Sequence, residues 1–131
     1  MFKLRSFLAG NIVMLRISFY LLLAIVTYLS LRARISGIDI QVNDKIGHAL
    51  AYFALTVNGG LAFGKKRYIH LAVGLFLFGL IIELLQGLVP GRTSSSLDLL
   101  ANSTGIVIGL AILFIFGKSI LNQFNRFGWI K

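Results

Sequence analysis

The sequence contains no cysteine and a single proline, Pro90, among its 131 residues. The absence of cysteine excludes disulfide bonds, thiolate metal sites and cysteine nucleophiles. Charged residues are also scarce, at 13% of the chain, whereas soluble domains carry roughly 25%. A water-soluble fold of this composition would lack the polar surface needed to cover itself, which argues against the soluble enzyme classes.

Hydrophobic residues make up 57% of the chain, and they form long uncharged runs. No Lys, Arg, Asp or Glu occurs between Lys45 and Lys65 or between Asp98 and Lys118. About 20 helical residues span the ~30 Å hydrocarbon core of a bilayer. The pattern therefore predicts an all-α polytopic membrane protein, a single domain with a bundle of four transmembrane helices. The expected helices cover about residues 12–31, 45–63, 68–89 and 97–116.

The distribution of basic residues predicts an orientation, because cytoplasmic loops retain Lys and Arg. With a cytoplasmic amino terminus, nine basic residues lie inside and four outside. We therefore expect a protein of the cytoplasmic membrane with both termini in the cytoplasm. The inner residues are Lys3, Arg5, Arg16, Lys65, Lys66, Arg67, Lys118, Arg126 and Lys131, and the outer ones are Arg32, Arg34, Lys45 and Arg92. Loop retention and anionic lipids explain the net charge of +9, so no nucleic acid partner is predicted.

Polar faces occur near the predicted outer ends of the second and third helices. At about 100° of rotation per residue, Asp44, His48 and Tyr52 share one face of the second helix, and Glu83 and Gln86 are neighbours on the third. A carboxylate that faces lipid costs roughly 2.5 to 3.5 kcal/mol at the helix centre. We therefore expect Glu83 to face the interior of the bundle.

The fourth helix carries a matching stripe. Asp98 and Asn102 are four residues apart, and Gly105 and Gly109 continue the same face towards the cytoplasm. Small residues at this spacing let a neighbouring helix approach closely. The three polar faces should converge above this contact and form a pocket that opens outward.

Several side chains in this pocket suit binding or proton transfer. Arg92 and Lys45, at its rim, could bind a phosphate or carboxylate, while Glu83 and His48 could act as acid or base. The Asp44-x-x-x-His48 pair is a weak indication of a metal site, and we predict neither a metal nor another cofactor. For amide side chains such as Asn58, hydrogen bonding between helices is the alternative explanation.

The polar residues fall in a succession of short motifs. These are Asp44-Lys45-Ile46-Gly47-His48, then Tyr52, Glu83-Leu84-Leu85-Gln86, Pro90-Gly91-Arg92-Thr93 and Asp98-Leu99-Leu100-Ala101-Asn102, followed by Gly105 and Gly109. Over about residues 44–109 this order and spacing resemble the VanZ-like family. That family consists of small bacterial integral membrane proteins and is named for a factor that lowers susceptibility to the glycopeptide teicoplanin. It has no settled biochemical activity, so the resemblance implies a membrane fold and a polar site but no reaction.

Three functions are compatible with these observations. The first is binding or modification of a cell-envelope component, such as a lipid-linked or peptidoglycan-related headgroup. The second is a small proton-coupled transporter that acts as an oligomer, and the third is a non-catalytic membrane assembly partner. The predicted catalytic residues are Glu83, His48, Asp44 and Asp98, and the predicted ligand-binding residues are Arg92, Lys45, Tyr52, Gln86 and Asn102. Besides this ligand the expected partner is the lipid bilayer, and the sequence leaves the oligomeric state open.

Overall fold

The computed structural model describes the backbone of residues 2–32 and 41–126 and the side chains of residues 12–32 and 44–123. The elements are α1 (Phe2–Leu31), α2 (Gln41–Phe63), the 3-10 helix η1 (Lys65–Arg67), α3 (Tyr68–Gln86) and α4 (Ser96–Arg126). No strand occurs in this part of the chain, so the predicted all-α fold is confirmed.

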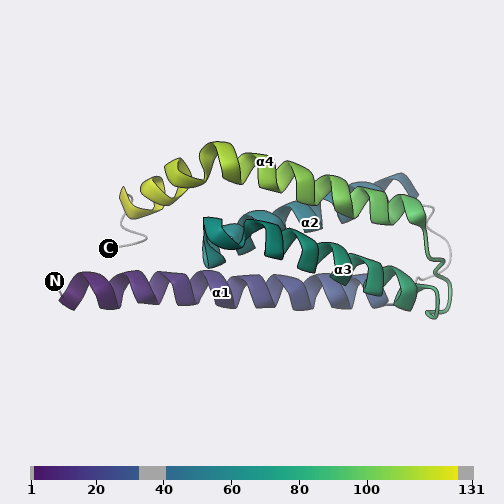
Figure 1. Ribbon diagram of the computed structural model, residues 1–131. Coiled ribbons are helices and arrows are strands. Elements are labelled where there is room, and N and C mark those ends of the chain that lie inside the picture. Colours follow the sequence, from purple (N-terminus) through teal and green to yellow (C-terminus); the bar gives the residue numbers. More distant parts are fainter. Residues whose placement is uncertain (1, 33–40, 127–131) are drawn as a thin grey trace.

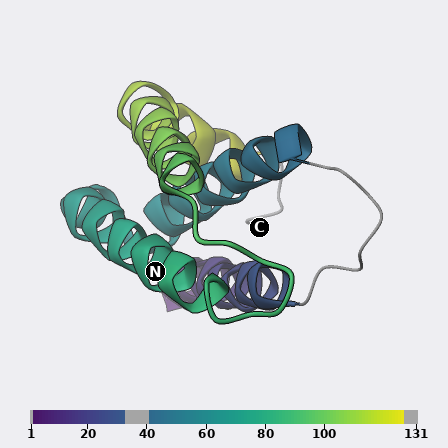
Figure 2. The same cartoon turned by 90° about the vertical axis from the view of Figure 1, so that its right-hand side faces the viewer.

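The four α-helices run along one common axis as an elongated bundle (Figure 1). The beginning of α1 and the end of α4 lie at one end, and the α3–α4 connection lies at the opposite end, here called the loop end. Helix α2 packs most extensively against α4 and also contacts α1 and α3. Viewed from the loop end, the α3–α4 connection passes across the end of α1 before it reaches α4 (Figure 2).

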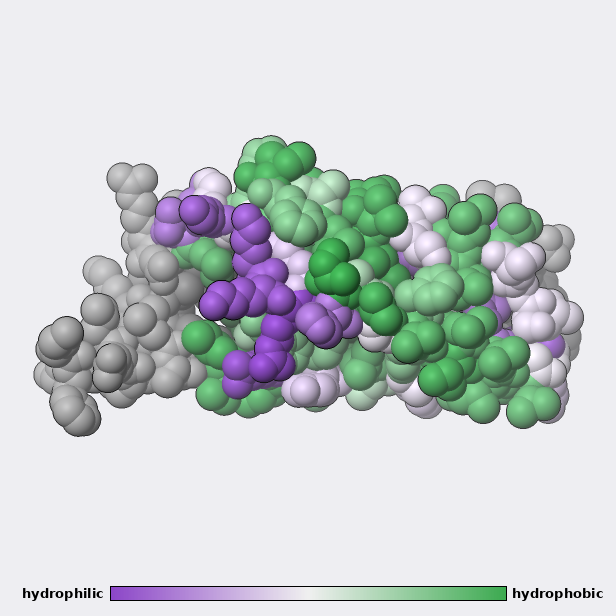
Figure 3. Space-filling view, in the orientation of Figure 1, coloured by the Kyte–Doolittle hydropathy of each residue, from purple (hydrophilic) through white to green (hydrophobic). Residues whose placement is uncertain are grey.

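Many large apolar side chains are exposed on the outside of the bundle, and Figure 3 shows how they cover much of one face. Examples from three helices are Tyr28, Leu84 and Ile115, each at least 64% exposed. Four helices are long and apolar enough to cross a membrane, over Ile12–Leu31, Asp44–Phe63, Lys65–Gln86 and Ser96–Gln123. Because exposed apolar surface of this extent requires an apolar surrounding, the chain is a multi-pass membrane protein.

Four helix boundaries differ by three residues or more from those expected, and one of them is the start of α2, at Gln41 instead of residue 45. Helix α1 begins at Phe2 and α4 continues to Arg126, because a run of apolar residues marks only the part of a helix that lies in lipid. Helix α3 ends at Gln86, three residues before the predicted boundary at 89. There the backbone turns, with Val89 N–H donating to the Gln86 carbonyl, because the residues before Pro90 leave the helical conformation. Gly91, with φ of 77°, completes the turn.

The glycines of α4 set its distance from α2. A Cβ atom added at Gly105 would collide with the backbone carbonyl of Ala49, and one at Gly109 would lie 2.7 Å from the Cβ of Thr56. Only residues without a side chain permit this approach. The predicted close packing by Gly105 and Gly109 is confirmed, and it places the first turns of α2 and α4 side by side at the loop end.

Basic residues gather at the opposite end of the bundle. Lys65, Lys66 and Arg67 of η1 are exposed. Figure 3 shows a hydrophilic patch beside the apolar surface. Other charged residues that entered the sequence analysis have side chains outside the described residues: Lys3, Arg5, Arg34, Arg126 and Lys131.

Candidate functional site

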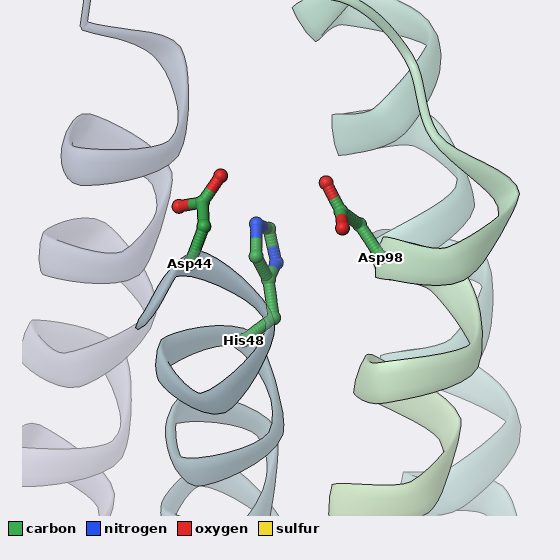
Figure 4. Close-up of side chains that lie close together, drawn as sticks. All are labelled: Asp44, His48 and Asp98. Atoms are coloured by element: carbon green, nitrogen blue, oxygen red, sulfur yellow. The ribbon is translucent and has the colours of Figure 1, made fainter. Parts of the chain in front are cut away.

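Asp44 and His48 from α2 meet Asp98 from α4 at the loop end (Figure 4). One ligand-type atom of each side chain lies within 4.8 Å of the corresponding atoms of the other two. The imidazole of His48 stands between the two carboxyl groups. We call these three residues the Asp–His cluster. His48 and Asp98 are each 8% exposed, so most of the cluster is removed from solvent.

A hydrogen bond between helices fixes the orientation of His48. Its Nδ1 lies 3.0 Å from Oδ1 of Asn102 on α4. The amide oxygen can only accept, so a protonated Nδ1 donates this bond. The other ring nitrogen, Nε2, takes no part in this bond and, when it carries no proton, offers a lone pair to a ligand.

Glu83 of α3 faces the interior of the bundle. This was expected, because exposing a carboxylate to lipid costs free energy. Glu83 is 4% exposed, and its Oε2 accepts a hydrogen bond of 3.0 Å from the backbone N–H of Ser95. Glu83 lies close enough to all three residues of the Asp–His cluster for their charges to act on it. The three polar faces therefore converge, and among the described residues Glu83 is held by the backbone of the α3–α4 connection.

Four buried polar atoms around the cluster have no hydrogen-bond partner among the described residues: Tyr52 Oη, Glu83 Oε1, Asp98 Oδ1 and Asn102 Nδ2. Gly79 of α3 lies beside two of them, since a Cβ at this position would be 3.2 Å from both Tyr52 Oη and Asn102 Nδ2. Buried polar groups are nearly always paired in folded proteins. Four exceptions in one place indicate a site built to receive polar ligand atoms or water.

Two hollows adjoin the Asp–His cluster. One, of about 210 Å³, is lined by Ser30, Arg32, Asp44, His48 and Arg92, together with apolar residues. The other, of about 280 Å³, lies towards the α3–α4 connection and is more polar. Its lining includes Asp44, Lys45, Gln86, Arg92, Thr93, Ser95 and Asp98.

Lys45 stands at the edge of the second hollow. Its Nζ lies 3.6 Å from Oδ1 of Asp98, and its side chain is 41% exposed. This distance gives an ion pair but exceeds that of a good charged hydrogen bond. The Lys45 ammonium therefore remains accessible to an anion in the hollow.

Two of the predicted ligand-binding residues also anchor α1. Arg92 donates from Nε to the Arg32 carbonyl at 3.1 Å and from Nη2 to the Leu29 carbonyl at 3.2 Å. Gln86 donates from Nε2 to the Ser30 carbonyl at 2.9 Å. The last carbonyls of a helix lack partners within it, and basic or amide side chains can satisfy them. We call Gln86 and Arg92 the α1 anchor. The sequence analysis missed this role, because spacing along one chain does not identify a carbonyl on another helix.

Asn58 lies away from the site. Its Nδ2 donates to Oγ of Ser18 on α1 at 2.9 Å, as the alternative explanation for amide side chains proposed. Two contributors at the loop end were not anticipated: the Ser95 amide, which binds Glu83, and the Ser30 carbonyl, which receives Gln86. Both are backbone groups, for which the sequence carries no signal.

Four apolar helices around a buried acidic and imidazole site define a multi-pass helical membrane protein. Within this class, the chain matches the family model VanZ/LLP1 over residues 3–117, and it belongs to that family. The match confirms the VanZ-like resemblance and extends it from residues 44–109 to most of the chain. Neither the curated proteins nor the solved structures contain a significant match.

Proposed function

We propose that this VanZ-family protein binds an anionic headgroup of a cell-envelope component in the hollows at the loop end, which faces the outside of the cytoplasmic membrane. The ligand is a lipid-linked or peptidoglycan-related molecule, and a change in its amount or form would alter susceptibility to teicoplanin. In this proposal Lys45 and Arg92 attract the anionic group. Tyr52, Asn102, Glu83 and the Asp–His cluster bind its polar atoms or transfer protons.

The observation that carries this proposal is the set of four buried polar atoms beside the hollows that have no hydrogen-bond partner among the described residues. Burying a polar group without a hydrogen bond costs about 1 to 3 kcal/mol. A bound molecule with donors and acceptors would recover that energy. The polar lining and the neighbouring Lys45 ammonium favour an anionic, oxygen-rich group over an apolar ligand.

The packing below the site favours binding from one side over transport. Tyr52, Leu55 and Thr56 are fully buried directly along α2 from His48. Further towards η1, a Cβ at Gly60 would collide with the side chain of Leu113. A transport path would require polar or open space at these levels of the bundle. The arrangement therefore supports a pocket that opens at the loop end.

The distribution of basic residues supports the proposed orientation. The exposed residues Lys65, Lys66 and Arg67 lie at the end opposite the site, and basic loops remain in the cytoplasm. Cysteines introduced singly at Ser94 and at Lys66 test this orientation, because the chain has no cysteine of its own. A membrane-impermeant thiol reagent on intact cells should label S94C and leave K66C unlabelled. The reverse pattern would contradict an outward site.

The ligand is tested by purifying the full chain in mild detergent and identifying co-purified molecules by mass spectrometry. We expect a phosphate- or carboxylate-bearing envelope molecule with the unmodified protein and strongly reduced amounts with Glu83→Gln and Lys45→Ala. Leu88→Ala is the matched control, because Leu88 is 81% exposed and lines neither hollow. Equal recovery from all four proteins would show that the molecule is bulk lipid and would refute the proposal.

A further inference from the structure

We infer that the Asp–His cluster is a binding site for one divalent transition-metal cation, such as Zn²⁺ or Mn²⁺, with Asp44, His48 and Asp98 as its protein ligands. The sequence analysis predicted no metal, because it identified only the weak Asp44 and His48 pair. The third ligand comes from a different helix, fifty residues further along the chain. The metal site does not rest on the proposed function, since cation binding is measured without any envelope ligand.

The geometry of the three side chains carries the inference. Three atoms within 4.8 Å of one another surround a point that lies within about 2.8 Å of each. Ligand distances to zinc are shorter, about 2.0 to 2.2 Å for nitrogen and oxygen. Modest side-chain rotations that draw the atoms together would complete the coordination.

The surroundings of His48 supply an independent indication. A histidine that binds metal through one ring nitrogen almost always donates a hydrogen bond from the other. Here Nδ1 donates to Asn102 Oδ1, and Nε2 is presented to the space between the carboxyl groups (Figure 4). A histidine that only bridged two helices would not require carboxylates on either side of its second nitrogen.

Asp98 supplies a second independent indication. The residue is 8% exposed and its side chain 11% exposed, and the buried Oδ1 has no hydrogen-bond donor among the described residues. Its carboxyl group faces the imidazole of His48. The Lys45 ammonium, at 3.6 Å and partly exposed, compensates this charge only weakly. A divalent cation bound by two carboxylates and one imidazole would satisfy the buried oxygen directly.

The ligand set determines the class of metal. Carboxylates alone favour Mg²⁺ or Ca²⁺, whereas imidazole favours zinc and its first-row neighbours. Three protein ligands also leave at least one coordination position, as in catalytic zinc sites. Asp44 lines both hollows, so that position would be accessible to an oxygen of a bound anion. The cation would thereby polarise that anion beside Glu83.

The experiment is isothermal titration of the full chain, purified in a zwitterionic detergent after removal of any tag, with Zn²⁺, Mn²⁺ and Mg²⁺. We expect one equivalent of Zn²⁺ or Mn²⁺ per chain and at least about tenfold weaker binding of Mg²⁺. Asp98→Asn and His48→Gln should weaken transition-metal binding by about 100-fold or more, because each removes a direct ligand. His70→Gln should bind like the unmodified protein, since this exposed histidine lies on α3 outside the cluster.

A melting curve recorded without metal shows whether each variant is folded. The metal should raise the melting temperature of the unmodified protein and of His70→Gln but not of Asp98→Asn. Equal binding by Asp98→Asn, His48→Gln and the unmodified protein would overturn the inference, and so would the absence of binding in the unmodified protein. A tightly bound metal with no co-purified envelope molecule would support the metal site and contradict only the proposed function.

Discussion

Helices α2 and α4 meet in two regions that differ in how completely their atoms are paired. In the middle of the bundle, Gly105 and Gly109 of α4 lie in direct contact with Ala49 and Thr56 of α2. At the loop end the same two helices bury Asp98 Oδ1 and Asn102 Nδ2, which find no hydrogen-bond partner in the described part of the chain. The first region holds the structure together, whereas the second carries polar groups that stability alone does not require.

The close contact explains how the polar region can persist. Unpaired buried groups cost free energy, so they require compensation elsewhere in the fold. The α2–α4 contact and the apolar core around Tyr52 and Leu55 supply it. The α1 anchor adds hydrogen bonds beside the site, with Arg92 and Gln86 bound to carbonyls at the end of α1. The comparison predicts that substitutions in the packed regions reduce stability and that substitutions in the cluster reduce function.

The largest loss of stability should come from Gly105→Ala. The new methyl group would meet the Ala49 carbonyl, and overpacking of this kind costs about 1 to 3 kcal/mol. Unfolding in detergent, followed by circular dichroism, measures the change. Gly74→Ala is the matched control, because no atom lies within 4 Å of the added methyl group. Equal stability of the two variants would contradict the assignment of the middle region.

A smaller loss should follow from Arg92→Ala, which removes two hydrogen bonds to the end of α1. Because these bonds are exposed, we expect a loss of about 1 kcal/mol and faster amide hydrogen exchange near the end of α1. Thr93→Ala, in the same loop, should leave both quantities unchanged. Arg92→Lys should restore little, since one ammonium cannot reproduce the geometry of the guanidinium. Unaltered exchange in Arg92→Ala would refute the anchor.

The bond between Ser18 and Asn58 tests the contribution of a paired polar contact within the membrane. A double-mutant cycle with Ser18→Ala and Asn58→Ala should give a coupling energy of about 0.6 kcal/mol, the average for such bonds. Neither variant should affect metal or ligand binding, because Asn58 lies away from the site. A change in binding would place the boundary of the site deeper in the bundle.

The smallest change in stability should come from Asp98→Asn. The amide has nearly the same shape as the carboxyl group and removes a buried charge, while the lost ion pair with partly exposed Lys45 contributes no more than about 1 kcal/mol. Metal-free protein should therefore unfold at nearly the same denaturant concentration, or at a higher one. Destabilisation comparable to that of Gly105→Ala would show that Asp98 is structural and would remove the distinction between the two regions.

The sequence predicted the helices better than their ends and the site better than the roles within it. Long apolar runs located all four spans, but they could not show that α1 begins at Phe2 or that α4 reaches Arg126. Helical periodicity placed Glu83, His48 and Asp98 on inward faces. It gave no indication that Gln86 and Arg92 bind carbonyls of α1, because those partners are backbone atoms far away in the sequence.

Composition and periodicity by themselves determined that the chain spans a membrane and which faces of its helices are polar. These properties follow from the length of apolar runs and the rotation per residue, which are local. Only the tertiary structure decided which polar groups meet. The distance and relative rotation of α2 and α4 depend on glycine packing, and they bring Asp98 to His48 while the α3–α4 connection brings Arg92 to α1. Relations between helices are set by how surfaces fit together, which no single stretch of sequence encodes.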